Sequence, residues 1–205
     1  MPGMVGGMNW SGSAYDPVRG LLIVNANVLP SKARLVPRSD FDDRTQRHED
    51  GEYATQAATP YGLFRRFLQA PSGLPCIKPP WGLLTAVDLA AGTNRWSVPL
   101  GSMAAFGDGA TIPAGSVSLG GPIVTASGLV FIAGTFDSAI RAFDITSGRE
   151  LWKGRLPTGG HATPVTYESP TGRQFVVIAA GGHAKVTEEP LGDSLVAFSI
   201  DGRRN

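Results

Sequence analysis

Few side chains in this sequence are reactive near neutral pH, and three of those few are histidines. His183 follows Gly181 and Gly182 directly after an apolar run, where a buried strand would deliver it to the end of a sheet. An imidazole can donate or accept a hydrogen bond there and can change its charge near neutral pH. A histidine after a Gly-Gly turn is also commonly an exposed loop residue. The residue types alone therefore leave both interpretations open.

The remaining candidates have simpler interpretations. His161 lies between two glycines and a nearby proline, which predicts a solvated turn. His48 stands beside Glu49 and Asp50, but the spacing is not that of a metal site. Cys76 is the single cysteine, so it forms no intrachain disulfide, and no reactive-cysteine motif surrounds it. We expect its side chain to be a small buried apolar group.

The composition favours short strands and tight turns over long helices. Hydrophobic residues make up 42% of the 205 residues and charged residues 17%, with 27 glycines and 16 prolines. The net charge is +1, so no overall field would attract nucleic acid or anionic lipid. A small uncharged partner is expected. No apolar run reaches the roughly 20 residues of a membrane-spanning helix, and the first residues do not resemble a signal peptide.

An internal repeat indicates the architecture. Residues 86–96 (AVDLAAGTNRW) and 142–152 (AFDITSGRELW) align without a gap as A-x-D-x-x-x-G-x-x-x-W. The copies begin 56 residues apart (142 − 86), and a third copy begins at Ala197. Asp and Gly at this offset suit a turn. The two tryptophans of the motif, Trp96 and Trp152, can each bury on the order of 200 Å² between neighbouring sheets, and we expect both to be largely buried.

An apolar run precedes each copy of the motif, at residues 20–25, 128–134 and 173–182. Near-continuous apolar runs bounded by turn residues are typical of strands buried on both faces. Pairing each run with the motif that follows gives a four-stranded unit of the length of a propeller blade. The sequence therefore predicts an all-β chain, a partial β-propeller of about three four-stranded blades.

A long insertion at about 26–80 interrupts the first of these units. We expect its charged first half, up to Glu52, to be a solvated loop. The segment YGLFRRFLQ, residues 61–69, would form a short helix or simply cover one propeller face. Loops of this length in compact domains are usually functional or mobile, so we place the insertion over the face that carries the active site.

The blade motif with its terminal tryptophan resembles the tryptophan-docking repeat of dehydrogenases that depend on pyrroloquinoline quinone (PQQ), which are eight-bladed propellers. Longer strings resemble the C-terminal part of the membrane-bound quinoprotein glucose dehydrogenases in particular, in order and over essentially the whole chain. These strings are GGMNWSGSAYDP (6–17), GLPCIKPPWGLLTAVD (73–88), SGLVFIAGTFDSAIRAFD (127–144) and VVIAAGGHAKVTEEPLGDSLVAF (176–198).

The resemblance implies a function and a setting. An aldose such as glucose would be oxidised to its lactone by PQQ, with a divalent cation, calcium or magnesium, beside the cofactor. Electrons would pass to ubiquinone at the periplasmic face of the inner membrane. The catalytic Asp and the cation ligands of this family correspond to segments upstream of this sequence. We therefore expect no catalytic and no metal-binding residue in this chain, and no activity from the chain alone.

The resemblance also implies which residues lie near the cofactor. Asn9 matches an asparagine whose amide hydrogen-bonds the quinone oxygens, which would stabilise negative charge on the reduced quinone. His183 matches a histidine near PQQ and the sugar, and Gly182 would let the backbone approach the ligand. The alternative role for Asn9 is that of a turn residue that caps backbone amides. Trp10 and Trp81 could line the pocket, but packing between blades is the commoner role.

Two other interpretations fit part of the pattern. A non-catalytic propeller built from the same repeat, acting as an assembly scaffold, would share the tryptophan motif without needing the Asn-Trp pair or the AGGH string. A truncated gene product would have no activity of its own. In either case an incomplete propeller leaves sheet faces and edges that the rest of a propeller or another chain would cover.

Overall fold

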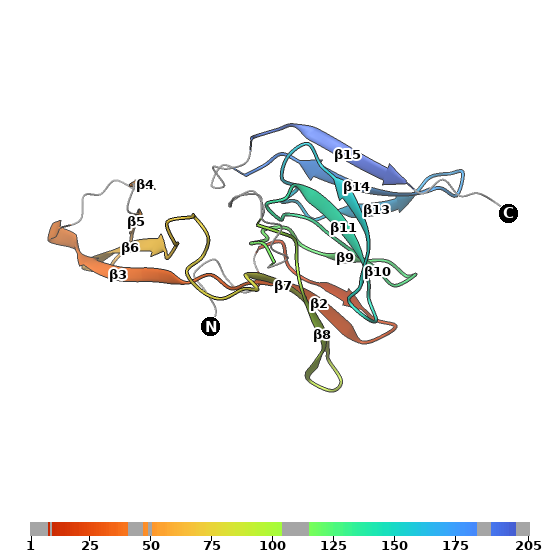
Figure 1. The fold of residues 1–205 in the computed structure, drawn as a ribbon, viewed down its shortest axis with the longest axis horizontal. Coiled ribbons are helices and arrows are strands. Elements are labelled where there is room, and N and C mark those ends of the chain that lie inside the picture. Colours follow the sequence, from red (N-terminus) through yellow and green to blue (C-terminus); the bar gives the residue numbers. More distant parts are fainter. Residues whose placement is uncertain are drawn as a thin grey trace.

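The computed structural model describes residues 8, 10–40, 47–48, 51–103, 115–183 and 190–199, with the backbone alone at 47–48. Its described elements are antiparallel β-strands in four sheets and one 3₁₀ turn, η1 (Arg38–Asp40) (Figure 1). The all-β prediction is confirmed. Among the described residues, no helix is long and apolar enough to span a membrane.

Three of the sheets are successive propeller blades, as the repeat predicted. In blade 1 the strands run β1 (Ala14–Asp16), β2 (Leu21–Asn27), β7 (Gly82–Asp88) and β8 (Thr93–Pro99) from one edge to the other. Blade 2 has β9 (Ile123–Val124), β10 (Leu129–Ile132), β11 (Ala139–Asp144) and β12 (Glu150–Arg155). Blade 3 has the three strands β13 (Val165–Glu168), β14 (Gln174–Ala180) and β15 (Ser194–Ser199).

Each complete copy of the sequence motif forms the outer hairpin of a blade. In blade 2 the Asp144 carboxylate accepts hydrogen bonds from the amides of Thr146 and Ser147 at 3.1 and 2.8 Å, and Gly148 has a φ of +71°. Asp88 and Gly92 do the same in blade 1. The turn that the Asp-Gly spacing predicted is therefore present in both.

Apolar side chains between the blades form the core. Between blades 1 and 2 the fully buried residues include Ile23, Leu84, Val130 and Ile132. Between blades 2 and 3, Ile140 and Leu156 pack against Ile178. Strand β10 contributes to both layers because its two faces meet different blades, which explains why its sequence is apolar without alternation.

The motif tryptophan of blade 1 binds the next blade. The Trp96 Nε1 donates a 2.8 Å hydrogen bond to the carbonyl oxygen of Ile145, and a Cβ at Gly148 would lie 2.6 Å from the indole. Trp96 is partly buried there. Trp152 is 38% exposed, so the expectation that it is largely buried is wrong. Its ring meets Phe198 edge to face, while Ile200, which has the same position in the third motif copy as Ile145 has in the second, lies outside the described residues.

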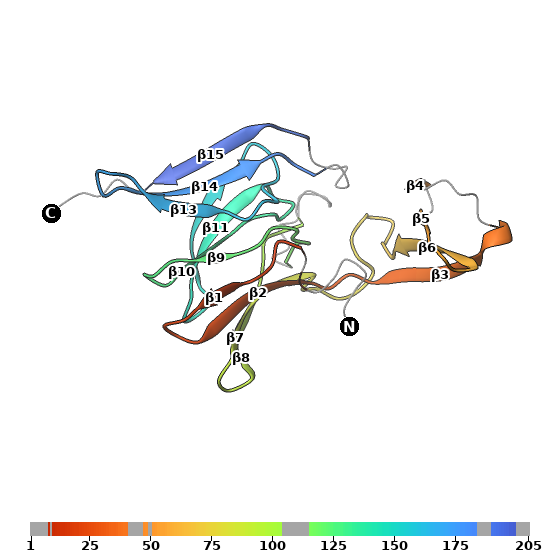
Figure 2. The ribbon, with the colours of Figure 1, turned by 180° about the vertical axis from the view of Figure 1, so that it is seen from behind.

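The described strands between β2 and β7 form a fourth antiparallel sheet, which we call the arm. Its order is β3 (Ser31–Pro37), β6 (Tyr61–Phe67), β5 (Gly51–Thr55) and β4 (Arg47–His48). The first half of the insertion, expected to be a solvated loop, contains strand β3, and the helix considered for residues 61–69 is wrong because Tyr61–Phe67 pairs with β3. Figures 1 and 2 show the arm projecting away from the three blades.

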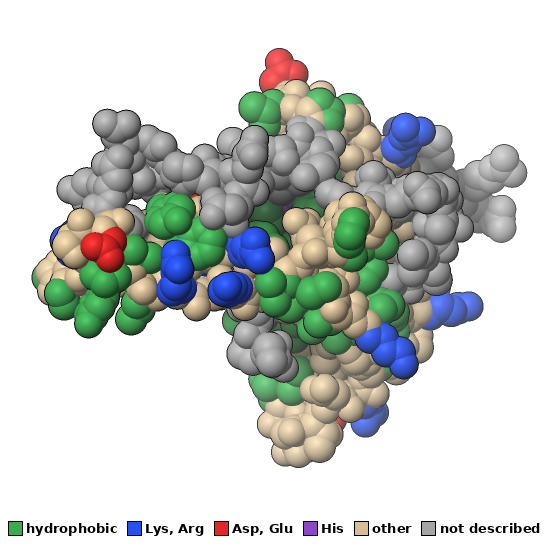
Figure 3. All heavy atoms as spheres, turned by 60° about the vertical axis from the view of Figure 1, so that its left-hand side comes forward, with side chains coloured by type: hydrophobic (Ala, Val, Ile, Leu, Met, Phe, Trp, Pro, Cys, Tyr) green, Lys and Arg blue, Asp and Glu red, His purple; other side chains and the backbone are tan. Residues whose placement is uncertain are grey.

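One face of the arm carries exposed apolar side chains. Paired residues of β3 and β6 point to the same side, and Leu35, Tyr61 and Phe67 on one side are 60%, 43% and 49% exposed. The other side buries Val36 and Phe64. Hydrophobic and basic side chains both lie over this part of the molecule in Figure 3. Cys76 lies between the arm and β7 and is exposed, so the prediction that it is buried is wrong. Its backbone amide donates a hydrogen bond to the carbonyl oxygen of Leu68 at the surface.

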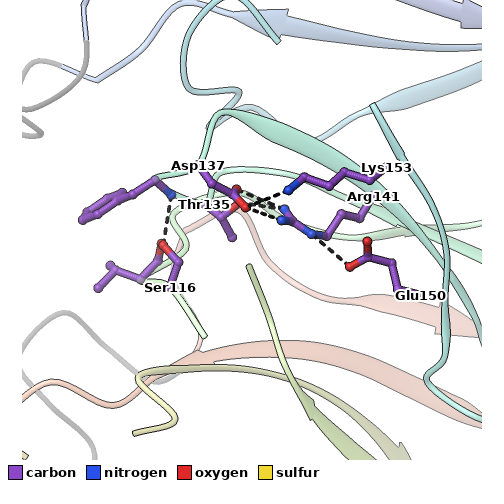
Figure 4. A network of polar contacts seen from close by, with 8 residues as sticks. Ser116, Thr135, Asp137, Arg141, Glu150 and Lys153 are labelled. Carbon is purple, nitrogen blue, oxygen red and sulfur yellow. Dashed lines mark hydrogen bonds and ion pairs between the residues drawn. The ribbon is translucent and has the colours of Figure 1, made fainter. Parts of the chain in front are cut away.

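An ion-pair network holds the turn between β10 and β11 (Figure 4). The guanidinium of Arg141, which is 3% exposed, donates to both oxygens of Asp137 and, from Nε, to Glu150 at 3.1 Å. The Thr135 hydroxyl donates to Asp137 at 2.6 Å, and the Lys153 ammonium lies 3.4 Å from the same carboxylate. Two adjoining segments of one blade are thus tied together by a buried positive charge.

The environment of Asp137 shifts its titration. Burial on its own would raise the pKa of Asp137, but the hydrogen bonds and charge of Arg141, helped by Thr135 and Lys153, lower it below its ordinary value of 3.8. The folded state therefore holds this carboxylate ionised to lower pH than the unfolded chain does. Its contribution to stability is complete above about pH 5 and is lost as the pH falls through the lowered pKa.

Replacing Trp96 with Ala is expected to lower the free energy of unfolding by about 2–3 kcal/mol, below the 3–5 of a fully buried tryptophan because the ring is only partly covered. Trp152→Ala should cost about 1 kcal/mol, since that ring is more exposed and retains one aromatic partner. Urea unfolding of the chain followed by circular dichroism measures both. Equal losses of unfolding free energy in the two variants would show that the contact of Trp96 with Ile145 adds no stability.

Replacing Asp137 with Asn should cost on the order of 3 kcal/mol at pH 7, because it leaves the buried Arg141 charge with fewer partners. The same variant should lose less stability than the wild-type chain between pH 5 and pH 3, the window around the 3.8 value. Asp40→Asn, at an exposed position, is the matched control for the loss of one carboxylate and should cost little stability at pH 7. If the stability of Asp137→Asn falls as steeply between pH 5 and pH 3 as that of the wild-type chain, the assignment is contradicted.

Candidate functional site

The three blades bring their inner edges together at one end, which we call the site end. There β1, β9 and β13 begin and β2, β10 and β14 finish, because each pair is antiparallel. Strands β1 and β9 lie against each other at the inner edge. The segments directly before these strands, residues 10–13, 118–122 and 161–164, are the lead-in segments, and they meet at the site end.

Glycines allow these backbones to approach closely. A Cβ at Gly121 would lie 2.1 Å from the carbonyl oxygen of Ser11, and one at Gly134 would lie 2.4 Å from the amide nitrogen of Gly120. Both distances are far inside van der Waals contact, so a larger residue would force the segments apart. Gly134 also has a φ of +84°, which disfavours other residues.

Hydrogen bonds join the lead-in segments to one another and to β2. The Ser11 hydroxyl donates to Leu119 at 2.6 Å, and the Thr163 hydroxyl donates to Ser11 at 3.3 Å. The Asn27 amide group exchanges two hydrogen bonds with the backbone of Ser118, at 2.8 and 3.0 Å. Asn25, only 1% exposed, donates to Gly120 at 2.9 Å. The site end is therefore a bonded framework rather than a set of separate loops.

Three aromatic rings lie together on this framework. The His183 imidazole stacks on the Trp10 indole with a centroid distance of 5.8 Å and an interplanar angle of 25°. His161 meets the same imidazole edge to face, at 5.8 Å and 77°. Trp10 is 68% exposed, His183 is half-buried and His161 is 8% exposed. The cluster thus offers an indole face and an imidazole at the inner edge of the blades.

Strand β14 and its two following glycines position His183. The amide of Gly182 donates a 2.9 Å hydrogen bond to the carbonyl oxygen of Gly159. Gly182 has a φ of +66°, and a Cβ there would lie 2.6 Å from the carbonyl oxygen of Pro190. Gly182 therefore makes the turn that presents His183, and its expected contact with a cofactor stays a prediction.

The other candidates from the sequence have different fates. Asn9 lies outside the described residues, directly before Trp10, and so does the side chain of His48. His161 is buried in the ring cluster, so the solvated turn expected for it is wrong: the turn faces the inner edge of the blades, where Gly134 packs against it. Trp81 packs with Met103 beside the arm, while Trp10 lies at the site end, where its ring reaches from blade 1 to His183 of blade 3.

The register of the blades contains a signal that the sequence reading missed. In blades 1 and 3 the motif alanine pairs with a residue of the second strand, which in turn pairs with a residue of the innermost strand. Trp10 and His161 each lie four residues before that residue of the innermost strand, so they occupy equivalent positions in the two blades. By the same register His183 lies six residues after Val177, and Asp137 lies six residues after Phe131. Aligning the inner strands, in addition to the tryptophan motif, would have placed His161 at the site.

Within the described part of the chain, no three His, Cys, Asp or Glu side chains are grouped so that they could hold a metal ion. The chemistry that this cluster itself offers is hydrogen bonding by imidazole and stacking on a flat aromatic face. Those are binding and orienting roles, which suit a planar ligand with polar oxygens.

Comparison with known proteins identifies this arrangement. Residues 1–176 match the family described as PQQ glucose/ethanol/alcohol dehydrogenase, β-propeller domain. The chain is 37% identical to the quinate/shikimate dehydrogenase (quinone) of Acinetobacter baylyi, over 98% of this chain and 26% of the relative. It is also 37% identical to the quinoprotein glucose dehydrogenase of Escherichia coli, over 97% of this chain and 26% of the relative.

A solved structure supports the fold. The europium-containing methanol dehydrogenase matches with a TM-score of 0.59 at 24% identity, covering 87% of this chain and 25% of that protein. The chain spans about a quarter of the length of the curated relatives it matches. With its repeated blades, docking tryptophan and matching sequence, the chain belongs to the PQQ-dependent glucose, ethanol and alcohol dehydrogenase family and is a segment of that family's β-propeller domain.

Proposed function

We propose that this chain forms one wall of the cofactor site in a dehydrogenase that oxidises a ring-shaped polyol, with an aldose such as glucose as its substrate. The observation that carries the proposal is the Trp10–His183–His161 cluster at the site end, where the inner edges of the blades meet. The aldose would leave as its lactone, and the electrons would pass to ubiquinone at the periplasmic face of the inner membrane.

The side chains present fit PQQ. A planar quinone needs a flat apolar surface for its ring system and N–H donors for its oxygens. The exposed indole of Trp10 supplies the surface, and the half-buried His183 imidazole supplies a donor beside it. We assign to Asn9, the neighbour of Trp10, the second donor, an uncharged amide that would stabilise negative charge on the quinone oxygens.

When bound, PQQ accepts two electrons from the carbinol carbon of the substrate. The chain's own residues bind and orient. His183 donates a hydrogen bond to a substrate hydroxyl or a cofactor oxygen, and the Gly182–Gly159 hydrogen bond keeps the strand end that carries it in place. The base that removes the hydroxyl proton and the ligands of the calcium or magnesium ion are assigned to segments outside this chain.

The relatives also favour a second substrate class. Identity to a quinate/shikimate dehydrogenase equals that to a glucose dehydrogenase. Quinate and glucose are both six-membered rings with secondary hydroxyls, but quinate carries a carboxylate that would need a cationic partner. The cluster itself contains imidazoles and an indole, which suit a neutral polyol. Steady-state oxidation of the two substrates by one enzyme separates these candidates.

The open face of blade 3 indicates a partner. Val177, Ala179, Leu195 and Ala197 stand where blade 2 has Phe131, Ala133, Ile140 and Ala142. Those four residues of blade 2 are buried against blade 3, whereas Leu195 is 75% exposed. We assign to this face a further blade, from the rest of a propeller or from another chain, because an apolar face of this kind requires cover.

A chimaera tests the assigned role of His183. This chain would replace the matching quarter of the Escherichia coli quinoprotein glucose dehydrogenase, with PQQ and magnesium supplied. His183→Asn should raise the glucose KM or the PQQ Kd about two- to tenfold, the value of one hydrogen bond in a binding site. The melting temperature without PQQ should stay the same. Thr171→Asn, at an exposed turn on the far end of the blade, is the control. A lower melting temperature with unchanged KM and Kd would make His183 a structural turn residue.

The chain by itself should be inactive, because the base and the cation ligands are assigned to other segments. Purified 205-residue chain with PQQ, calcium or magnesium, glucose and an artificial electron acceptor should reduce the acceptor no faster than a blank without protein. Turnover well above the blank would place the catalytic groups within these residues and overturn that assignment.

A further inference from the structure

We propose that His161 is a positioning residue for His183: its buried imidazole holds the His183 ring against Trp10 in the orientation that faces the site. The edge-to-face contact at 5.8 Å and 77° is the observation that carries this proposal. The consequence for PQQ binding rests on the proposed function, whereas the effect on the His183 ring does not.

His161 is the anchored member of the cluster. It is 8% exposed, and its neighbour Gly160 leaves no room beside it, since a Cβ at Gly160 would lie 2.7 Å from Leu156 and 3.0 Å from Ile178. On the other side a Cβ at Gly134 would lie 3.4 Å from the His161 Nδ1. The ring is therefore packed between the β10–β11 turn of blade 2 and the core of blade 3.

His183, by contrast, is less deeply buried than His161. It follows Gly181 and Gly182, which have no side chains to restrict it, and it is half-buried. Its ring contacts include Trp10, which is 68% exposed, and the buried His161. An exposed indole on a lead-in segment is a weak support for an orientation. Of these two rings, the buried His161 is the better able to fix it, with a preference of roughly two- to tenfold over other orientations.

The alternative is that Trp10 alone orients His183. Stacking on an indole shifts the imidazole proton resonances of His183 through the ring current, so this shift reports the orientation directly. Trp10→Ala removes the indole and defines the full loss of the shift. The variants His161→Ala, His161→Gln and His161→Phe then separate the two explanations, because Phe keeps the ring edge without the imidazole nitrogens.

The experiment uses the full 205-residue chain labelled with ¹³C-histidine, with circular dichroism to establish that each variant is folded and His183→Asn to assign the resonance. His161→Ala and His161→Gln should remove roughly half or more of the shift that Trp10→Ala removes, and His161→Phe should retain most of it. If Ala fails to fold, the pair of Gln and Phe carries the comparison.

Equilibrium dialysis against PQQ provides the second measurement, in the chimaera described above. His161→Ala should weaken PQQ binding about two- to tenfold and His161→Phe should restore it. An unchanged His183 resonance in His161→Ala and His161→Gln, or equal losses in Phe and Gln, would overturn the positioning role. If the resonance shifts as expected while no variant alters PQQ binding, the positioning role stands and the assignment of the cluster to the cofactor fails.

Discussion

The close approach of three backbones at the site end is the constraint on which the rest of the molecule depends. Gly120, Gly121 and Gly134 lie where a single added carbon would fall 2.1–2.6 Å from another backbone atom. Because these contacts join the lead-in segments of blades 1 and 2, and the hydrogen bond from Thr163 to Ser11 adds that of blade 3, Trp10 from blade 1 can reach residues of blade 3. The apolar layers between blades and the dock of Trp96 then fix how the sheets stack behind that point.

The fold was largely predictable because its signals are local and repeated. The Asp-Gly turn, the tryptophan and the apolar run each occur in successive copies, so a wrong interpretation of one copy is corrected by the next copy. The arm was not predictable in the same way: it occurs once, and its strand β6 mixes charged and apolar residues without a strict alternation. Trp152 was mispredicted because burial of a docking tryptophan depends on what stands opposite it, which no pattern around the residue records.

The site was only partly predictable for a related reason. His183 stands at the end of an apolar strand, and that position is visible in the sequence. The burial of His161 arises from Gly134, which is 27 residues away in the chain and belongs to another blade. Without the facing blade, the Gly-Gly-His sequence at His161 indicates a solvated turn. Contacts between blades, rather than the local sequence, decided which histidine was part of the cluster.

The turn that follows the second strand of each blade takes a different form in each of the three. In blade 1 it is expanded into the arm, in blade 2 it is closed by Asp137 and Arg141, and in blade 3 it carries His183. These turns lie outside the apolar layers that hold the blades together. Selection can therefore lengthen or recharge one of them without disturbing the stack, so a family with this architecture can acquire new substrates one turn at a time while its scaffold stays the same.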